Sequence, residues 1–292
     1  MRITETMRYE NVLRDIGRAQ QRVLKAQEQV ATGKKVNKPS DDPVAASDIL
    51  RINGEKSEDV QYSRNLTFAR SKLQFTDAAL DSVEQMAERV RTLGQLSFSD
   101  PDKATGYLTE IQGLRDQMIA AANSAYAGRF IFGGSQTTQA PYVKGPGGTV
   151  TFGGNAQDMP MQISRTVKVP TQIPGSDLFT GTVDIFAVLD DLATAIQAKD
   201  KAGIDAQLRN LETFAESISL SRSKIGGYLN LVTNVESDLS AAKLSHETEL
   251  TNKEAVDLAA AITELTASQN GLQATLAVGA KISQVSILNY LK

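Results

Sequence analysis

The hydrophobic positions at the two ends of the chain follow a coiled-coil repeat, with spacings that alternate between four and three residues. The two series are Tyr9, Leu13, Ile16, Gln20, Val23, Gln27 and Val30, and Leu258, Ile262, Leu265, Gln269, Leu272, Leu276 and Gly279. This spacing gives a helix one apolar stripe, which is buried only when another helix packs on it. We therefore expect the two ends to complete each other, and the protein to act by assembly rather than by catalysis.

The first helix is predicted to end in the segment 31–43, which contains Gly33 and two prolines. Asp42 followed by Pro43 predicts the start of the next helix, because an Asp N-cap accepts unpaired amide hydrogens and proline is well tolerated at the first helical position. Hydrophobic residues at helical spacing then predict helices over 44–93, 103–127, 183–198 and 204–250.

Residues 128–181 differ from the rest of the chain, since they contain ten of the 21 glycines and five of the eight prolines. Short stretches such as FIF, TVTF, MQI and TVKV lie between these turn residues, which predicts a small β-rich insert. The insert begins and ends in turn-rich sequence, so we expect that removing residues 135–180 spares the helices.

The fold predicted from these patterns is mainly α with a small β-rich insert. A long-helix bundle is formed jointly by the N- and C-terminal halves, and the two ends form coiled-coil arms. Three domains are expected: a terminal coiled-coil arm domain (1–43 with 251–292), a helical bundle domain (44–128 with 182–250) and a β-rich outer insert domain (129–181).

The composition lacks most of the side chains that enzymes use for catalysis. The 292 residues include no cysteine and one histidine, His246, which excludes disulfides, thiolate nucleophiles, iron–sulfur clusters and His-rich zinc sites. No apolar run approaches the ~18 residues of a membrane span, and the N-terminus lacks the apolar stretch of a secretory signal. We expect a protein that is cytosolic or is exported without a cleaved signal peptide.

The charge is unevenly distributed along the chain. Residues 1–38 contain nine Lys and Arg against four Asp and Glu, although the whole chain carries a net charge of −3. Arg14, Arg18 and Arg22 lie on one helical stripe, where like charges repel by a few tenths of a kcal/mol per pair. The stripe is either a solvated face or a contact with acids such as Asp257 or Glu264, in the same or a neighbouring subunit.

No group of residues resembles a catalytic, cofactor-binding or metal site. The glycine-rich stretches GPGG and TFGG match no nucleotide-binding motif. Asp41 and Asp42 could act as metal ligands or as an acid–base pair, but capping of the following helix accounts for them. Asp190 and Asp191 diverge by 100° on a helix, and nothing near His246 completes a triad. We predict no catalytic residue, no cofactor and no metal.

Two segments resemble the terminal regions of the bacterial flagellin superfamily. These are VATGKKVNKPSDDPVAA after the first helix and LTASQNGLQATLAVGAKISQVSILNYL at the end of the chain. The stretch Pro39, Ser40, Asp41, Asp42 and Pro43, together with FIFGGSQTTQAPY and DIFAVLDDLATAI, is similar to the hook-associated protein 3 branch of that superfamily.

The resemblance implies a structural protein of the bacterial flagellum. It would polymerise at the distal end of the hook and join hook-associated protein 1 to the flagellin filament, after export through the flagellar type III apparatus with a cytosolic chaperone. The terminal arms would form an inner coiled-coil tube, the remaining helices the next shell, and the insert the outer surface. Neither nucleic-acid binding nor membrane insertion is expected.

The residues expected to form the assembly interface are those of the two terminal stripes. They are Leu13, Ile16, Gln20, Val23, Gln27, Val30, Leu258, Ile262, Leu265, Gln269, Leu272 and Leu276. The three glutamines either fix the register of the seam or lie at a tolerant edge. The first helix is short and polar, so we expect the arms to become ordered only on assembly.

Two other functions fit the sequence. One is a short or minor flagellin that forms the filament itself. The other, from a different class, is an adaptor whose basic arm binds an anionic membrane or nucleic acid.

Overall fold

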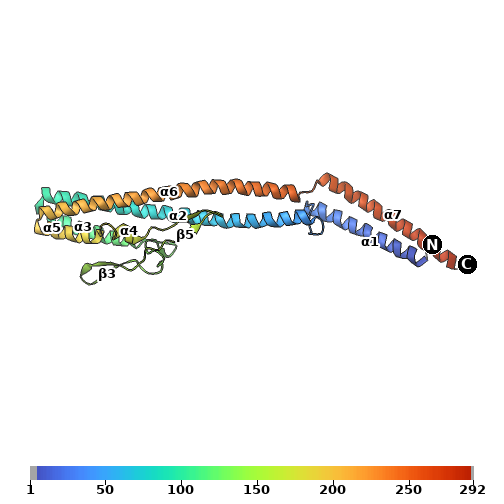
Figure 1. Ribbon diagram of the computed structural model, residues 1–292, viewed down its shortest axis with the longest axis horizontal. Coiled ribbons are helices and arrows are strands. Elements are labelled where there is room, and N and C mark those ends of the chain that lie inside the picture. The colour runs from blue at the N-terminus through green and yellow to red at the C-terminus, as the bar shows by residue number, and fades with distance from the viewer. Residues whose placement is uncertain (1–4, 291–292) are drawn as a thin grey trace. The chain divides into compact units, whose positions relative to one another are not determined.

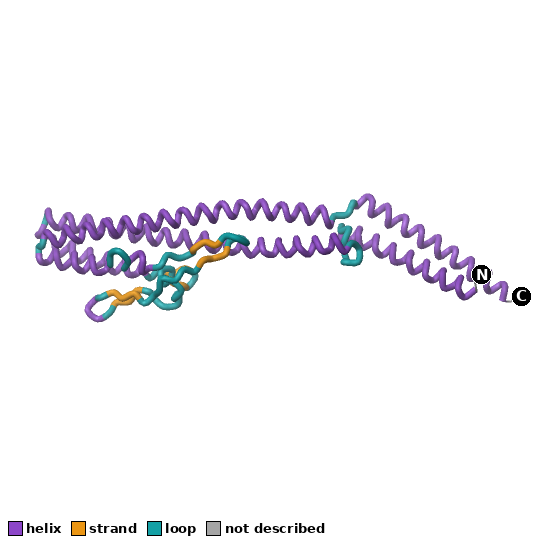
Figure 2. Tube along the Cα trace, viewed as in Figure 1, coloured by secondary structure: helices purple, strands orange, loops and turns teal. Residues whose placement is uncertain are grey.

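The protein is mainly helical in its computed structural model, which describes residues 5–290 (Figures 1 and 2). Arg2 of the basic arm lies outside the described residues. The α-helices are α1 (Glu5–Thr32), α2 (Pro43–Ser99), α3 (Ala104–Ala122), α4 (Gly175–Phe179), α5 (Ile185–Ala198), α6 (Lys201–Glu254) and α7 (Leu258–Tyr290).

Short strands occur only between α3 and α4 in the described part of the chain, as three separate antiparallel pairs. β1 (Ala125–Tyr126) pairs with β2 (Arg129–Phe130), β3 (Tyr142–Lys144) with β4 (Val150–Phe152), and β5 (Pro160–Gln162) with β6 (Lys168–Pro170). Two 3₁₀ turns, η1 (Pro101–Lys103) and η2 (Pro146–Gly148), complete the elements. The mainly helical fold with a small β-rich insert is therefore confirmed.

The chain forms two compact units. The first contains residues 1–58 and 242–292, and the second contains residues 59–241. The helices α2 and α6 each contribute residues to both units. In this division residues 129–181 belong to the same unit as the helices around them, and the three expected domains stay a prediction.

Aspartates begin several helices, as the sequence indicated for α2. Asp42 Oδ1 accepts hydrogen bonds from the amides of Val44 and Ala45 at 3.1 and 3.0 Å, and α2 begins at Pro43. Asp184 accepts in the same way from the first amides of α5, and Asp257 from those of α7. Each cap satisfies amide hydrogens that have no partner inside the helix, so the helix start is fixed locally.

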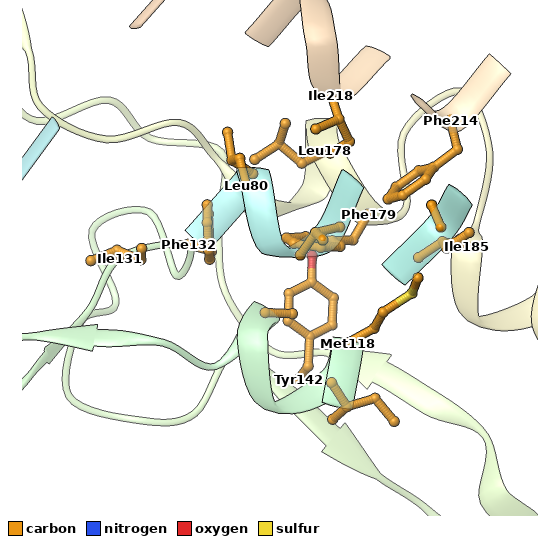
Figure 3. Packing of buried hydrophobic residues seen from close by; sticks show 14 of the residues in the cluster. Leu80, Met118, Ile131, Phe132, Tyr142, Leu178, Phe179, Ile185, Phe214 and Ile218 are labelled. Carbon is orange, nitrogen blue, oxygen red and sulfur yellow. The ribbon is translucent and has the colours of Figure 1, made fainter. Parts of the chain in front are cut away.

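Aromatic residues from the insert and from the helices share one hydrophobic core in the second unit (Figure 3). Phe132 and Phe179 pack edge to face with their ring centroids 5.3 Å apart, and Tyr142 lies 5.4 Å from both Phe179 and Phe186. Tyr142 is 2% exposed, and Phe179 is fully buried. The insert thus supplies part of the core on which the helices pack.

This arrangement contradicts the expectation that removing residues 135–180 would spare the helices. Tyr142 and Phe179 lie inside that segment and are among the largest buried side chains of the described residues. The sequence did not reveal this, because the strands are only two or three residues long and show no alternating pattern.

Ion pairs join the helices of the second unit. Arg222 on α6 binds three carboxylates spaced along one face of α2, with distances of 3.1 Å to Asp77, 2.8 Å to Asp81 and 2.7 Å to Glu84. These carboxylates raise the pKa of the Arg222 guanidinium, chiefly through its hydrogen bond to Asp77. One cation thus relieves the mutual repulsion of three anions and fixes the register of α6 against α2.

Candidate assembly surfaces of the terminal helices

The helices α1 and α7 pack side by side and run in opposite directions in the first unit (Figure 1). Gly279 of α7 lies against Val12 and Ile16 near the start of α1, and the loops at the other end of each helix are joined by a backbone bridge. The shielded residues of α1 recur at spacings of four and three, as do those of α7. The two series are Val12, Ile16, Ala19, Val23, Ala26 and Val30, and Ala261, Leu265, Ser268, Leu272, Thr275 and Gly279, and Gly17, Glu28, Gln29 and Gly271 beside them are also partly shielded.

This seam is shifted by one residue from the predicted stripe at about half of its positions. Of the predicted residues, Ile16, Val23, Val30, Leu265 and Leu272 are partly or fully shielded in the pair. The other seven are exposed: Leu13, Gln20, Gln27, Leu258, Ile262, Gln269 and Leu276.

Small side chains explain the shift. Ala19 and Ala26 are 1% and 3% exposed, and Ala261 is 5% exposed. An alanine or glycine in the seam allows two helix backbones to approach closely, whereas the glutamines fit better outside it. A repeat that is anchored on large aliphatic residues such as Leu13 and Ile262 therefore runs through the neighbouring positions, glutamines included.

The pair retains large apolar side chains on its outer faces. On α1, Tyr9, Leu13 and Leu24 are 56%, 51% and 63% exposed. On α7, Leu258, Ile262, Leu276 and Val278 are between 46% and 55% exposed. A helix that is apolar on more than one face needs more than one packing partner. These outer stripes are candidate assembly surfaces.

A groove of about 890 Å³ lies between α1 and α7, with basic side chains along its α1 wall. Its lining residues are Val12, Asp15, Arg18, Gln21, Arg22, Lys25, Ala274, Thr275 and Val278. The hypothesis that this basic stripe contacts Asp257 or Glu264 stays a prediction, because the described residues of one subunit have other partners. Arg18 lies 3.7 Å from Asp15, while Asp257 accepts hydrogen bonds from the amides that begin α7.

The loops that precede α2 and α7 are joined to each other. Lys35 N donates to Glu254 O at 2.6 Å, and Val256 N donates to Gly33 O at 3.1 Å. The Lys34 ammonium lies 2.7 Å from the Glu254 carboxylate. Gly33 adopts a φ of +67°, the left-handed conformation in which helices often end. The loop between α1 and α2 and the loop between α6 and α7 are thus held next to each other in the first unit.

The two acids of the segment from Pro39 to Pro43, which precedes α2, make different contacts. Asp41 accepts hydrogen bonds from the amides of Asn37 and Lys38, and its carboxylate lies 2.8 Å from the Lys25 ammonium of α1. The hydrogen bond to Lys25 is the main cause of a lowered Asp41 pKa. Asp42 caps α2 instead, while Pro39 and Ser40 lie in the exposed turn. The two acids therefore have separate partners and do not form an acid–base pair.

A second set of ion pairs joins α2 and α6 in the first unit. Lys253 lies 2.6 Å from Asp48, and this contact lowers the Asp48 pKa. Arg51 binds both Glu55 and Glu249, at 3.0 and 2.9 Å, and His246 Nε2 lies 3.5 Å from Glu55. The partners of each pair across the two helices are about 200 residues apart in sequence, so no local motif could have identified them.

The described residues contain neither a membrane-spanning helix nor a cluster of metal ligands. No helix among them is long and apolar enough to span a membrane. No group of three or more His, Cys, Asp or Glu side chains is placed to hold a metal ion in this part of the chain.

Residues 3–137 match the family described as the bacterial flagellin N-terminal helical region. Flagellar hook-associated protein 3 of Salmonella typhimurium is 28% identical, over 94% of this chain and 95% of its own length. Flagellin of Bacillus subtilis is 24% identical, over 97% of both chains.

Solved structures share the fold. A flagellar hook-associated protein from Vibrio parahaemolyticus superimposes with a TM-score of 0.67 at 22% identity, covering 74% of this chain and all of that one. The family match at one end, the similarity along almost the whole length and the shared fold agree with one another. The chain is thus similar to flagellar hook-associated protein 3 along almost its whole length, and its residues 3–137 match the helical region at the N-terminus of bacterial flagellins.

Proposed function

We propose that this protein is a structural subunit of the hook–filament junction of the bacterial flagellum. It polymerises at the distal end of the hook and joins hook-associated protein 1 to the flagellin filament. The observation that carries the proposal is the outer surface of the α1–α7 pair, where large aliphatic side chains remain exposed after the two helices have packed.

The exposed stripes supply a driving force for assembly. Full burial of an aliphatic side chain contributes about 1.5–3 kcal/mol, so a leucine that is half exposed gains about 1 kcal/mol when a neighbour covers it. Leu13, Leu24, Leu258, Ile262 and Leu276 together offer about 5 kcal/mol for each subunit on this basis. That sum is large enough to favour lateral packing of the terminal pairs once the subunits are held close together.

The composition of α7 supports burial on more than one side. Over Leu258–Tyr290 the only charged residues are Glu264 and Lys281. A helix with so few charges is typical of the interior of a larger helical assembly. In the assembled junction, α7 packs against α1 of its own chain and against terminal helices of adjacent subunits.

The proposed partners follow from this role. Copies of the chain form a ring or a short helical layer, with hook-associated protein 1 on one side and flagellin on the other. A cytosolic chaperone holds the chain before the flagellar type III apparatus exports it, without cleavage of a signal peptide. The outer stripes of the α1–α7 pair become buried within the assembled layer.

Substitutions on either side of α1 test the proposal. Leu13→Asp places a charge on the exposed stripe and is expected to block incorporation at the hook while leaving the α1–α7 pair intact. Ala19→Asp places the same charge in the inner seam and is expected to disrupt the pair itself. Asn11→Asp, on the opposite face of α1 from Leu13, is the matched control and retains function.

Incorporation is measured by swimming motility and by immunogold labelling of isolated hooks, and pair integrity by hydrogen exchange of α1. Normal filaments with Leu13→Asp would contradict the assembly role of the outer stripe.

The second candidate is a short flagellin, because flagellins share the same terminal helical regions. Deletion of the gene separates the two functions. Loss of a junction protein leaves hooks without filaments and releases flagellin into the medium, whereas loss of a filament subunit releases no other flagellin. A basic-armed adaptor would instead show binding of residues 1–38 to anionic vesicles or to nucleic acid that weakens steeply with salt.

A further inference from the structure

Three aromatic side chains form a partly exposed patch on the second unit. Tyr126 of β1 lies 5.8 Å from Phe68 and 5.6 Å from Phe75, measured between ring centroids. Phe68 and Phe75 belong to α2 and are 40% and 38% exposed. Aromatic rings that remain open to solvent in a cluster are typical of a contact surface. We refer to Phe68, Phe75, Tyr126, Lys72 and Arg129 as the aromatic patch.

The two cations of the aromatic patch have no carboxylate partner in the described part of the chain. Lys72 lies between Phe68 and Phe75 on the same face of α2, and Arg129 is paired with Tyr126 across β1 and β2. Burial and the nearby positive charge of Arg129 lower the pKa of Lys72 to about 8. The two positive charges therefore repel each other, and an anionic partner would stabilise both.

A groove of opposite charge lies on the same unit, between α2 and α6. Its carboxylates are Glu84, Glu88, Glu212 and Glu216, and its other lining residues are Ala87, Arg91, Leu211, Ala215 and Ser219. The groove has a volume of about 260 Å³. We refer to it as the acidic groove.

The acidic groove is only partly neutralised within its own chain. Glu84 is bound to Arg222, and Glu88 lies 2.8 Å from Arg91. Glu212 and Glu216 are exposed and form no ion pair among the described residues, and they repel each other as like charges four positions apart on a helix. Leu220, one further turn along α6, is 60% exposed. The groove thus combines unpaired acids with apolar surface.

Helix geometry prevents the patch and the groove of one chain from meeting. Phe68 and Glu84 are 16 residues apart on α2, which corresponds to about 160° around the helix and about 24 Å along it. Phe75 and Arg91 have the same separation. The two surfaces therefore lie on nearly opposite sides of α2, at different levels.

We propose that the aromatic patch of one copy docks into the acidic groove of a second copy, head to tail. The proposal rests on the self-assembly stated under the proposed function and names one of its lateral contacts. The patch and the groove are complementary in charge, both contain apolar surface, and they lie on opposite sides of α2. Each copy can therefore bind one neighbour through its patch and another neighbour through its groove. Such a contact repeats from copy to copy and generates a ring or a helical layer, with the offset along α2 setting the step between neighbours.

Site-specific crosslinking tests the contact directly, because the natural chain contains no cysteine. Ser71→Cys places a thiol beside Phe68 and Phe75, and Ser219→Cys places one in the acidic groove. Both replacements change one atom only. Cells that carry the double variant in place of the natural chain are treated with a short bismaleimide, and their isolated hooks are separated on denaturing gels.

A head-to-tail contact predicts two different patterns. The double variant gives a ladder of oligomers, whereas co-expression of the two single variants gives dimers only, because each copy then carries one thiol. Either single variant alone stays monomeric. If the double variant is incorporated and supports swimming but gives no ladder, the contact is wrong and the junction function stands. If the natural chain itself is absent from hooks, the proposed function fails and the contact fails with it.

A charge exchange gives a second test that does not depend on crosslinking. Arg129→Glu is expected to lower incorporation about tenfold or more, because the new carboxylate faces the carboxylates of the acidic groove. Glu212→Lys with Glu216→Lys in the same chain is expected to restore it. Lys224→Glu, an exposed change of the same kind on α6, is the control and leaves incorporation unchanged. Failure of the exchange to restore a folded Arg129→Glu variant would overturn the contact.

Discussion

The backbone of Gly279 approaches Val12 so closely that a methyl group on its Cα would lie 3.0 Å from Val12 Cγ1. Contact at this distance is tighter than ordinary packing, so the neighbouring side chain would have to move by a few tenths of an ångström. Glycine at this position therefore sets how near α7 comes to α1. A large side chain at this position should therefore disturb the terminal pair more than a small one.

Gly279→Leu is expected to separate the two terminal helices, because the larger side chain must displace both Val12 and Ile16. Hydrogen exchange of α1 and α7 should become faster, while α3 and α5 in the second unit keep their protection. Gly279→Ala is the matched control, since the small clash is offset by the higher helix propensity of alanine, about 1 kcal/mol. Equal protection in the leucine and alanine variants would show that this approach does not hold the pair together.

The first unit should lose stability in acid. Lys25 and Lys253 lower the pKa values of Asp41 and Asp48, so folding favours the ionised carboxylates. The stabilisation is fully present above the ordinary pKa of 3.8 and is lost as the pH falls through the lower folded values. Hydrogen exchange of residues 33–42, followed between pH 6 and pH 2, measures this loss.

Asp41→Asn isolates one of these two contributions. The variant should be less stable than the natural chain at neutral pH, and its stability should depend less on pH in the acid range. Asp205→Asn, an exposed change on α6, should leave the profile of the natural chain unaltered. An unchanged acid dependence in Asp41→Asn would remove the Lys25 contact as its cause.

Arg222→Ala should destabilise the second unit more than an ordinary surface substitution does. It leaves Asp77, Asp81 and Glu84 on one face of α2 without their shared cation. We expect a loss of about 1–2 kcal/mol, because several partly shielded charges are coupled. Arg209→Ala, on an exposed position of the same helix, should cost less than about 0.5 kcal/mol. Urea denaturation followed by circular dichroism compares the two variants.

Two neighbouring residues of β3 should respond very differently to the same truncation. Tyr142→Ala removes a ring that is 2% exposed and packs against Phe179 and Phe186, which should cost about 3–5 kcal/mol. Val143→Ala changes a side chain that is 53% exposed and should cost less than about 0.5 kcal/mol. Thermal denaturation checks the difference. Similar stability in the two variants would mean that the insert is independent of the helical core.

Local signals predicted the helices well. Asp42 and Pro43 mark the start of α2 because capping depends on a few adjacent residues, and the same holds for the break at Gly33. The long helices follow from hydrophobic spacing. These features need no knowledge of which parts of the chain meet in space.

The packing of those elements was harder to predict, because it depends on close approach rather than on hydrophobicity. Ala19 and Ala261 form part of the seam between the terminal helices, whereas the sequence pattern predicts the neighbouring Gln20 and Ile262. The core position of Tyr142 was missed for a related reason, since it lies in a strand of three residues. The acidic groove also brings together residues from α2 and α6 that have no common motif.

The antiparallel packing of α1 on α7 joins segments that are more than 200 residues apart in the chain. Contacts between such distant segments close a long loop, which makes them slow to form. A chain delivered one end first can therefore form the second unit early, whichever end leads. The terminal pair can form only after the last segment has arrived, so a complete pair indicates that the whole subunit has been delivered.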